Sequence, residues 1–597
     1  MEEEVARIAR MAPSTYAFAP ERYAEQLAAL IGEIDELAEL EGEGYRRALR
    51  RHPKDGSGFF SKSEIIRGFR YLNEALGWDR DENEFVARLR MKPVRTASGV
   101  APVTLLTKPH PCPGRCIFCP SDVRMPKSYL SDEPGAQRAA QHRFDPYAQT
   151  LSRLRTYHHT GHRVDKAELI VLGGTWSSYP EQYQLWFVKR SFDALNDFER
   201  WRDGTLAPPD TSGFEWAELD ERVDGRLADR SYNRIVTDHA DRHRDSCPGK
   251  QIATWEELAR AQSYNETSGA RCVGLVVETR PDHLTLEEVV RIRRLGATKV
   301  QLGYQSLSDE VLAANHRGHD VAATRRAMRL LRGAGLKIHA HWMPNLYGSS
   351  PERDVEDFAR IFADPDFRPD ELKIYPCSLI ESAELMTYWR DGRWRPYDHD
   401  ELLEVLLECL QQTPEYCRLT RVIRDIPGTD IIAGNRKTNF RELVEAELAQ
   451  RGLPARDIRA REVRHRQVEP GELELRETRY ATSVGEERFL QYVTSDDRLA
   501  AFLRLSLPAA QVEIPEISTS AMIREVHVYG RVVGIGERRA GRSQHLGLGT
   551  RLIDRAADLA ATAGFTDLAV ISAVGTRDYY RRLGFTDGDL YQHRRLG

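Results

Sequence analysis

The sequence predicts a multidomain α/β protein with a helical N-terminal region. Three observations support this prediction. Residues 1–90 are charged and helix-forming, strands and helices alternate between residues 91 and 385, and residues 476–597 form a further α/β unit. A chain of 597 residues is also too long for one hydrophobic core, and its 41% hydrophobic residues suffice for several.

The alternation is clearest from residue 167 onward. A strand at 167–174 runs into glycines, and a strand at 272–282 precedes a helix at 285–297. That helix leads to a strand at 298–306, and two further helix–strand pairs follow. This order predicts a parallel sheet, open or closed into a barrel, with functional residues at the C-terminal ends of its strands.

Composition divides the rest of the chain. Residues from about 198 to 262 are polar, charged and rich in turn residues, and we interpret them as an insertion or loop. Residues 386–475 form an Arg-rich connector. We therefore expect domains at 1–90, 91–385, 386–475 and 476–597.

The overall charge excludes few functions. The net charge is −5, the sequence pI is about 6.4 and the mean hydropathy is −0.54. These values argue against a generic nucleic-acid coat protein but leave room for a local basic groove. The N-terminus is acidic, with no secretory signal, and no apolar run is long enough to cross a bilayer. We expect a cytoplasmic protein with no membrane partner.

Three of the eight cysteines crowd into CPGRCIFC, at Cys112, Cys116 and Cys119. A disulfide framework is not expected in a long chain without a secretory signal. Three thiolates on a short loop shaped by Pro and Gly match three irons of a 4Fe–4S cluster and leave the fourth iron open to a small molecule. The alternatives are buried free thiols or zinc, for which His110 is the one close fourth ligand.

This spacing, with Phe118 before the last cysteine, resembles the radical S-adenosylmethionine (radical SAM) superfamily. The resemblance implies a partial (β/α) barrel in which SAM chelates the open iron and is cleaved to a 5′-deoxyadenosyl radical. A Gly-Gly-Thr sequence ends one strand where the superfamily often has Gly-Gly-Glu, and polar residues end later strands. The candidate SAM contacts are Gly173, Gly174, Thr175, Glu278 and Gln305. A simple turn and ordinary polar strand ends are the alternative interpretation.

The C-terminal region holds a glycine loop between a strand and a helix. The loop has the form Q-x-x-G-x-G, at Gln544, Gly547 and Gly549. Its amides and the helix N-terminus form an anion site suited to a pyrophosphate. The order strand, glycine loop, helix, strand and YYRRLGF resembles the GNAT acetyltransferases, which implies acetyl-CoA binding with Tyr580 near the thioester sulfur. A buried pair of Tyr579 and Tyr580 without a catalytic role is the alternative.

The two sites in this order resemble the family of the Elongator catalytic subunit. Motifs such as DKAELIVLGGT, GYQS, NHRGHD and REVHVYG keep their order over residues 90–597. The resemblance implies catalytic roles for Lys166 and Tyr580. It also implies an acetyl-CoA site formed by Lys166, Glu525, Val526, His527, Val528, Gln544, Gly547, Leu548, Gly549, Thr550 and Tyr580.

The same resemblance implies a reaction on the wobble uridine of tRNA. The deoxyadenosyl radical takes a hydrogen atom from the acetyl methyl group, and the carbon radical adds to C5 of uridine. Oxidation and hydrolysis then leave 5-carboxymethyluridine and CoA. Segments 46–54, 88–96 and 456–466 are basic and are candidate phosphate contacts near the anticodon, or else solvated charged faces. A homo-oligomer or a larger complex is left open.

Two rival functions are left open by the residues alone. One is a protein lysine acetyltransferase with a structural iron–sulfur cluster, and the other is a noncatalytic scaffold or RNA-binding subunit. The irregular spacing of Cys377, Cys409 and Cys417 favours buried thiols over a zinc site. Cys272 opens a strand and is expected in the core.

Overall fold

The computed structural model describes most of the chain. The described residues are 18–78, 80–96, 98–202, 205–206, 232–242, 251–424, 426–437, 439–464, 466, 468–529 and 547–597. They form two compact units. The units are Met1–Ala101 with Leu151–Lys166, and Pro102–Thr150 with Ala167–Gly597. The domain limits expected at residues 90, 385 and 475 stay predictions.

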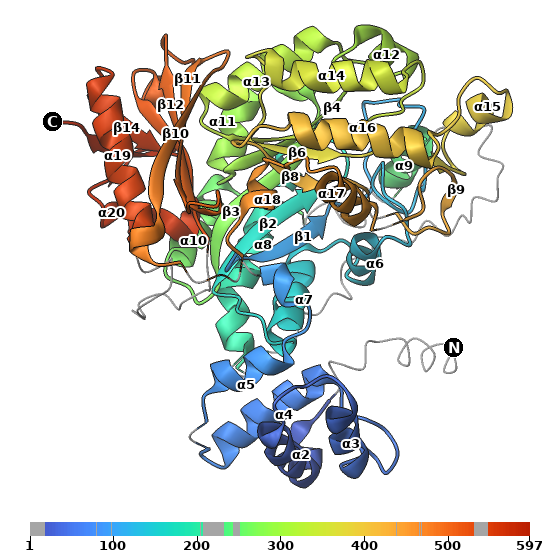
Figure 1. Ribbon diagram of the computed structural model, residues 1–597, viewed down its shortest axis with the longest axis vertical. Coiled ribbons are helices and arrows are strands. Elements are labelled where there is room, and N and C mark those ends of the chain that lie inside the picture. Colours follow the sequence, from blue (N-terminus) through green and yellow to red (C-terminus); the bar gives the residue numbers. More distant parts are fainter. Residues whose placement is uncertain are drawn as a thin grey trace. The chain divides into compact units, whose positions relative to one another are not determined.

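The first unit is helical, as the sequence predicts for this region (Figure 1). Its helices are α2 (Ala24–Glu36), α3 (Glu43–Arg51), α4 (Lys62–Ala75), α5 (Glu82–Leu89) and the C-terminal part of α7 (Pro146–His159). A capping box begins α4: the Ser61 hydroxyl accepts from the Glu64 amide (3.2 Å), and the Glu64 carboxylate accepts from the Ser61 amide (2.8 Å).

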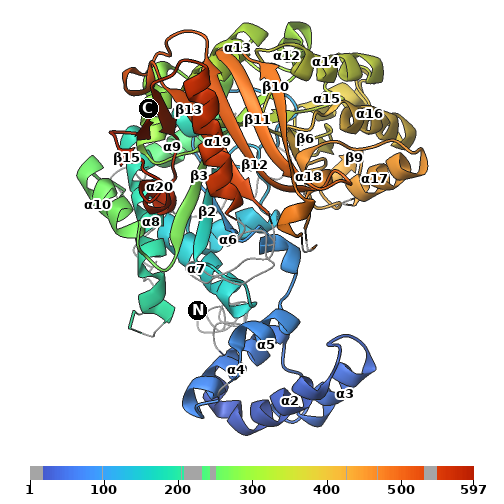
Figure 2. The same ribbon diagram turned by 60° about the vertical axis from the view of Figure 1, so that its left-hand side comes forward.

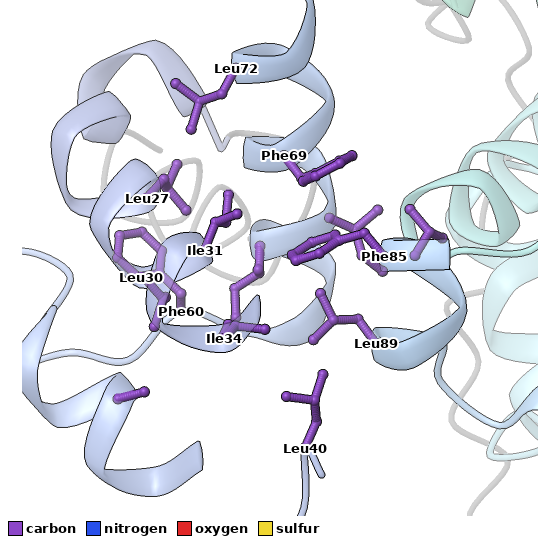
Figure 3. Close-up of a cluster of buried hydrophobic side chains, with 14 of the residues drawn as sticks. Leu27, Leu30, Ile31, Ile34, Leu40, Phe60, Phe69, Leu72, Phe85 and Leu89 are labelled. Atoms are coloured by element: carbon purple, nitrogen blue, oxygen red, sulfur yellow. The ribbon is translucent and has the colours of Figure 1, made fainter. Parts of the chain in front are cut away.

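Apolar side chains from three helices form the hydrophobic core of this unit (Figure 3). Ile31 of α2, Phe69 of α4 and Phe85 of α5 belong to one buried cluster, and the two phenyl rings stack with centroids 4.1 Å apart. Gly68 lets α2 and α4 approach closely, because a Cβ there would lie 2.7 Å from Leu27 Cδ1. The first unit therefore has a hydrophobic core of its own.

The second unit contains a seven-stranded sheet of order β1-β2-β3-β4-β5-β6-β8. The strands are β1 (Ala101–Leu106), β2 (Lys166–Leu172), β3 (Arg271–Thr279), β4 (Lys299–Gln305), β5 (Lys337–Trp342), β6 (Glu371–Ile374) and β8 (Arg418–Arg421). Every pair from β3 to β8 is parallel. The predicted parallel architecture of alternating strands and helices is thus confirmed (Figure 1).

Helices and a small two-stranded sheet surround these strands. The helices are α6 (Pro134–Gln141), α8 (Glu181–Arg202), α9 (Tyr232–Arg242), α10 (Trp255–Asn265), α11 (Leu286–Arg294), α12 (Asp309–Ala314), α13 (Val321–Gly333), α14 (Pro351–Ala363), α15 (Leu385–Arg390), α16 (His399–Gln412), α17 (Phe440–Gln450) and α18 (Ile458–Arg461), and the small sheet pairs β7 (Leu379–Ile380) with β9 (Ile431–Ala433). Much of the predicted insertion at 198–262 lies outside the described residues, and α9 and α10 fall in its described part. No helix in the described part of the chain is both long and apolar enough to cross a bilayer.

The sheet has one apolar and one polar face. Along β5, Ile338, Ala340 and Trp342 are fully buried, and α13 packs on this strand. The alternate positions are Lys337, His339 and His341, which therefore lie on the opposite face. We call this opposite face the inner face. The interior of a parallel barrel is normally filled by layers of branched apolar side chains, so polar side chains here call for an explanation.

A second sheet follows, of order β10-β11-β12-β13-β14-β16-β15. Its strands are β10 (Glu474–Ala481), β11 (Gly485–Val493), β12 (Leu499–Pro508), β13 (Ala521–Val528), β14 (Asp567–Val570), β15 (Thr586–Asp587) and β16 (Gln592–Arg595), and its helices are α19 (Leu548–Thr562) and α20 (Arg577–Arg581). Helix α19 packs across β12 and β13 (Figure 2). The predicted order of strand, helix and strand is confirmed.

Strand β13 separates from β14 part-way along its length. The two strands pair in parallel from Ala521 to Ile523, whereas β13 stays paired with β12 as far as Val528. The C-terminal half of β13 therefore borders a split in the sheet, next to the helix that begins at Leu548.

Buried ion pairs join the two sheets of this unit. Asp370, directly before β6, and Arg524 of β13 are both fully buried, and their side chains lie 2.5 Å apart. Arg524 also donates to Glu487 of β11 (3.0 Å). Burial alone would raise the pKa of Asp370, but the guanidinium groups of Arg524, Arg332 and Arg504 lower it well below its usual value. These ion pairs hold the two sheets together. Because they are buried, water could not solvate a charged group whose partner had been removed.

Candidate functional site

The three clustered cysteines lie on a non-helical loop after β1. Cys116 is 7% exposed, and Cys112 and Cys119 are partly buried. Asn233 of α9 holds the loop: its side-chain amide donates to the Cys112 carbonyl (2.7 Å) and accepts from the Cys112 amide (2.9 Å). A helix within the predicted insertion therefore positions this loop, a role that polar composition alone did not reveal.

Positive charge surrounds the thiols. Arg317 Nη1 lies 3.3 Å from Cys116 Sγ, and Arg280 acts on the same sulfur. A hydrogen bond from Cys119 and these guanidinium groups lower the pKa of Cys116 well below its usual range, against the effect of burial. Phe118 is buried beside Cys116 in one apolar cluster, as expected of a residue that shields the site. A thiolate is therefore the favoured state at Cys116.

Several buried polar atoms near the loop lack a hydrogen-bond partner among the described residues. They are Arg280 Nη1, Arg317 Nε, both ring nitrogens of His319 and Gln305 Oε1. Buried polar groups without partners are rare and mark places where a ligand binds. As placed, no three His, Cys, Asp or Glu side chains in the described chain are arranged around a metal ion. The donor chemistry nevertheless fits a thiolate-bound cluster and an anionic ligand.

The zinc alternative loses its fourth ligand. His110 Nε2 donates to the Ser178 carbonyl (3.1 Å), and its ring stacks on Tyr179 with centroids 4.4 Å apart. Burial, as the main cause, lowers the pKa of His110 to about 4. This histidine is therefore occupied in packing between the loop and the segment after β2.

The predicted SAM contacts at the ends of β2 and β4 include residues with positive φ angles. Gly173 and Gly174 follow β2 with φ of +136° and +93°, and a Cβ at Gly173 would collide with the Thr107 hydroxyl. Gln305 ends β4 with φ of +70°, and its side chain lies beside Gly303, as does that of Arg317. Strain in a non-glycine residue is typical of functional sites. The roles of Gly173, Gly174, Thr175 and Gln305 toward SAM stay predictions.

The predicted acetyl-CoA residues of β13 lie at the split in the second sheet. Glu525 is bonded to Arg504 Nε (2.8 Å) and to Lys337 of β5, so its carboxylate already has partners. His527 stacks on Phe502, and its ring is tilted against that of Tyr529. Its Nε2 is unpartnered among the described residues, and burial lowers its pKa to about 4. Val526 and Val528 are half-buried.

The start of α19 forms the other side of this split. Gln544 lies outside the described residues. Gly547 caps α19 with φ of +66°, and Leu548, Gly549 and Thr550 form its first turn. A Cβ at Gly549 would lie 2.8 Å from the Tyr579 hydroxyl. The first amides of a helix have no partner within the helix, which makes a helix start suited to an anion.

Tyr579 and Tyr580 differ in where they lie. Tyr580 is 8% exposed and packs on Phe585, and burial raises its pKa well above the usual value. Tyr579 instead brings its hydroxyl to Gly549 and hydrogen-bonds Thr550. The catalytic role expected for Tyr580 stays a prediction, and Tyr579 joins it as a candidate that the sequence patterns did not single out.

Lys166 is the first residue of β2 and is half-buried. The division of the chain places it at the end of the first unit. Its expected contact with acetyl-CoA stays a prediction.

Comparison with known proteins decides the family. Residues 369–450 match the Radical_SAM C-terminal domain. The chain is 38% identical over 498 residues to the tRNA uridine(34) acetyltransferase of Dehalococcoides mccartyi, covering 82% of this chain and 96% of that protein. It is 35% identical over 518 residues to Elongator complex protein 3 of Danio rerio, covering 84% of each. The chain belongs to the Elongator complex protein 3 (Elp3) family.

A solved structure of the Elp3 family has the same architecture. Archaeal Elp3 of Methanocaldococcus infernus with an N-terminal deletion aligns with a TM-score of 0.65 at 33% identity, over 84% of this chain and all of that one. The resemblance stated from the sequence is thus confirmed. The parallel sheet from β1 to β8 is the radical SAM half-barrel of the Elp3 family.

Four further cysteines of this Elp3 family member are buried, and Cys247 lies outside the described residues. Cys377, Cys409 and Cys417 are 3%, 0% and 0% exposed, and burial raises the pKa of each. The preference for buried thiols over zinc at these three cysteines stays a prediction. Cys272 is 1% exposed in β3, in the core as expected.

The basic segments are not equivalent. In segment 456–466, Arg461 is 4% exposed and donates to Asp497 (2.8 Å), so it holds the fold together. In segment 46–54, Arg46 is exposed on α3. Contacts of these segments with phosphates stay predictions, and Arg461 is removed from the candidates because its charge is already paired.

Proposed function

We propose that this protein is a tRNA-modifying radical SAM enzyme that uses acetyl-CoA to form 5-carboxymethyluridine at the wobble uridine. Relatives in its family carry the name tRNA uridine(34) acetyltransferase. The observation that carries the proposal is the presence of two sites in one unit. A loop of three cysteines lies beside guanidinium groups, and a split sheet lies beside the start of α19.

The residues of the first site have separate tasks. Cys112, Cys116 and Cys119 would hold the cluster, which together with SAM supplies a radical able to take a hydrogen atom from a methyl group. Arg317 would stabilise the thiolate of Cys116, and its positive charge would offset part of the negative charge of the three thiolates. Gly173 makes room for the Thr107 hydroxyl, and Gly174 has a positive φ that favours glycine.

The residues of the second site bind and orient the acyl carrier. The amides of the first turn of α19 would bind the pyrophosphate of acetyl-CoA. Extended pantetheine would follow β13 along the split that opens after Ile523. The Tyr579 hydroxyl, held at the helix start, is within reach of that path. A buried ion-pair junction keeps this site fixed against the half-barrel, as a short-lived radical requires.

The test of the function is product formation by the reconstituted enzyme. Anaerobically reconstituted protein is incubated with SAM, reductant and acetyl-CoA, with and without tRNA. Deoxyadenosine and CoA are expected to form much faster with tRNA, and digested tRNA should contain carboxymethyluridine by mass spectrometry. A tRNA without its anticodon stem-loop is the matched control. Equal deoxyadenosine formation in all three reactions, with unmodified tRNA, would reject the proposal, and acetylated lysines instead would favour a protein acetyltransferase.

Gly549→Glu is expected to abolish acetyl-CoA binding. The first carbon of the new side chain would lie 2.8 Å from the Tyr579 hydroxyl, and its carboxylate would put negative charge where an anion should bind. We expect affinity to fall by about 100-fold or more, because both space and charge oppose binding. Isothermal titration calorimetry with acetyl-CoA measures it. Ala561→Glu, an exposed change near the other end of α19, is the matched control and should leave affinity unchanged.

A further inference from the structure

The inner face of the half-barrel carries polar side chains at the level of the cysteine loop. We define the lumen cluster as Tyr129, Glu278, Gln301, His341, Lys373 and Tyr375. Four of these residues come from the adjacent parallel strands β3 to β6, and Tyr375 directly follows β6. Register pairs Glu278 with Gln301 and His341 with Lys373, so the strand residues lie side by side on one face. A packed barrel interior would have apolar residues here.

The lumen cluster has a buried floor. Gln301 and His341 are 3% and 4% exposed. Gln301 Oε1 lies 3.0 Å from His341 Nε2 and also accepts from Lys373 Nζ. His341 Nδ1 faces Glu278 Oε1 at 3.7 Å. These contacts fix the Glu278 carboxylate and the Lys373 ammonium at the edge of the floor.

The rim of the lumen cluster is partly exposed. The Glu278 side chain keeps 22% of its surface accessible, and Tyr129, Lys373 and Tyr375 are half-buried. The Tyr129 hydroxyl donates to Glu278 Oε2 at 3.3 Å. Burial raises the pKa of Glu278, while the charges of Lys373 and Arg424 oppose that rise. The partly exposed rim therefore combines a carboxylate, a hydroxyl, an ammonium and an aromatic ring.

The lumen cluster adjoins the cysteine loop. The Ser128 hydroxyl lies 3.1 Å from Cys119 Sγ, and Ser128 is followed directly by Tyr129. Arg424 binds the Ser128 carbonyl and lies 5.8 Å from the centre of the Tyr129 ring. A group bound in the lumen cluster would therefore lie next to the place where the radical forms, which is where a radical acceptor is needed.

The hydrogen-bonding pattern of the rim is complementary to one class of base. The pairing edge of uracil presents a carbonyl, an N3–H and a second carbonyl, so its receptor needs a donor, an acceptor and a donor. Lys373 has ammonium hydrogens besides the one that it donates to Gln301, and Glu278 Oε1 can accept. The Tyr129 hydroxyl would supply the second donor by turning its one hydrogen from Glu278 Oε2 to the base. We propose that the lumen cluster binds the uracil ring of the substrate, with Glu278 accepting the N3–H bond. This inference rests on the proposed function and names how its substrate base is selected.

Cytosine would be rejected by the same residues. Its N3 carries a lone pair in place of a hydrogen, so it would face the Glu278 carboxylate acceptor to acceptor, and its amino group would face the Lys373 ammonium donor to donor. Leaving buried polar groups unpaired is costly, and sites built in this way discriminate strongly. The half-buried Tyr375 ring adds a surface on which any base can stack. Stacking of this kind would raise the affinity for the base without distinguishing uracil from cytosine.

The proposal gives Glu278 a role other than the SAM contact expected from its strand-end position. Its oxygens contact Tyr129 and face His341, and Arg280 and Arg317 act on the Cys116 sulfur. Glu278 is thus a specificity-determining residue for the base. Loss of SAM binding and loss of base discrimination are separable measurements.

The experiment uses the reconstituted full chain and three anticodon stem-loops. They carry uridine, cytidine or N3-methyluridine at the wobble position, and binding is measured by fluorescence anisotropy with deoxyadenosine formation as a second readout. The unaltered protein should prefer uridine over both others by about 100-fold. Glu278→Gln should reduce the preference over cytidine to about 10-fold or less, because an amide both donates and accepts, with unchanged SAM affinity. Glu381→Gln, an exposed carboxylate of the same unit, should change nothing.

Each outcome decides the matter. Unaltered discrimination in Glu278→Gln overturns the proposal, as does a loss of SAM affinity with the uridine preference intact, which would make Glu278 a SAM ligand. Tyr129→Phe removes one hydroxyl with little change in volume. It provides a second test of the base site if Glu278→Gln misfolds. It should weaken uridine binding about 5–10-fold and leave SAM binding unchanged. Absence of tRNA-dependent deoxyadenosine in the unaltered protein would instead reject the proposed function, while the binding series would still test the base site.

Discussion

Replacing Cys112, Cys116 and Cys119 together with alanine is expected to give a colourless protein without cluster iron and without SAM cleavage. The three thiols share one short loop, and the loop's environment supports a thiolate at Cys116 through Arg317. Alanine offers no metal ligand, and no other group of three ligating side chains exists in the described chain to take over. The measurements are iron and sulfide per chain, the visible absorption of the reconstituted protein, and deoxyadenosine formation.

Cys377→Ala is the control for the cysteine experiment. Cys377 is buried in the same apolar cluster as Cys116 and Phe118, yet it is a structural thiol. It should therefore keep the cluster and SAM cleavage, with only a small loss of stability. Full iron content in the triple variant would show that the loop does not hold the cluster, and loss of iron in Cys377→Ala would show that packing and not ligation controls it.

Arg524→Met is expected to destabilise the second unit by about 3–5 kcal/mol, because it leaves buried carboxylates without their cation. Asp370 and Glu487 are 0% exposed and both bind Arg524. Unpaired, each carboxylate would have to take up a proton or admit water. Urea or thermal unfolding followed by circular dichroism should show a large downward shift of the midpoint.

Two further variants test whether the buried charge of Arg524 causes the loss of stability. Arg524→Lys keeps the charge but not the bidentate fork, so its loss should be intermediate. Arg329→Met removes an arginine of α13 whose pair with Glu513 is exposed, and it should change stability by about 0.5 kcal/mol or less. If all three variants unfolded at one midpoint, the buried junction would not be what stabilises this unit.

Local sequence patterns predicted the secondary structure and the order of the elements well. Apolar strands alternating with helix-forming segments predicted the parallel sheet. Such a prediction is possible because hydrophobic periodicity and helix-capping signals each depend on a few neighbouring residues. The cysteine spacing and the Gly-Gly turn after β2 were equally visible, since each depends on a short run of chain. The positive φ of Gly173 is the physical reason for that glycine.

Partners distant in the sequence could not be predicted in this way. Arg317 lies 201 positions from Cys116, and nothing in the spacing of either residue announces their contact. Glu525 fell in a segment expected to bind acetyl-CoA, yet its carboxylate is taken by Lys337, 188 positions away. Such pairs depend on how strands stack into sheets and on how the sheets meet.

The sequence by itself determined two local features, a three-thiol loop and a glycine-capped helix, because each is encoded in a few consecutive residues. The tertiary structure alone decided which side chains surround them. It placed Asn233 of the predicted insertion beside the loop, turned Tyr579 rather than Tyr580 toward α19, and lined the half-barrel with the lumen cluster. The physical reason is that charge and hydrogen-bond partners are selected by proximity in the folded chain, which the order of residues does not state.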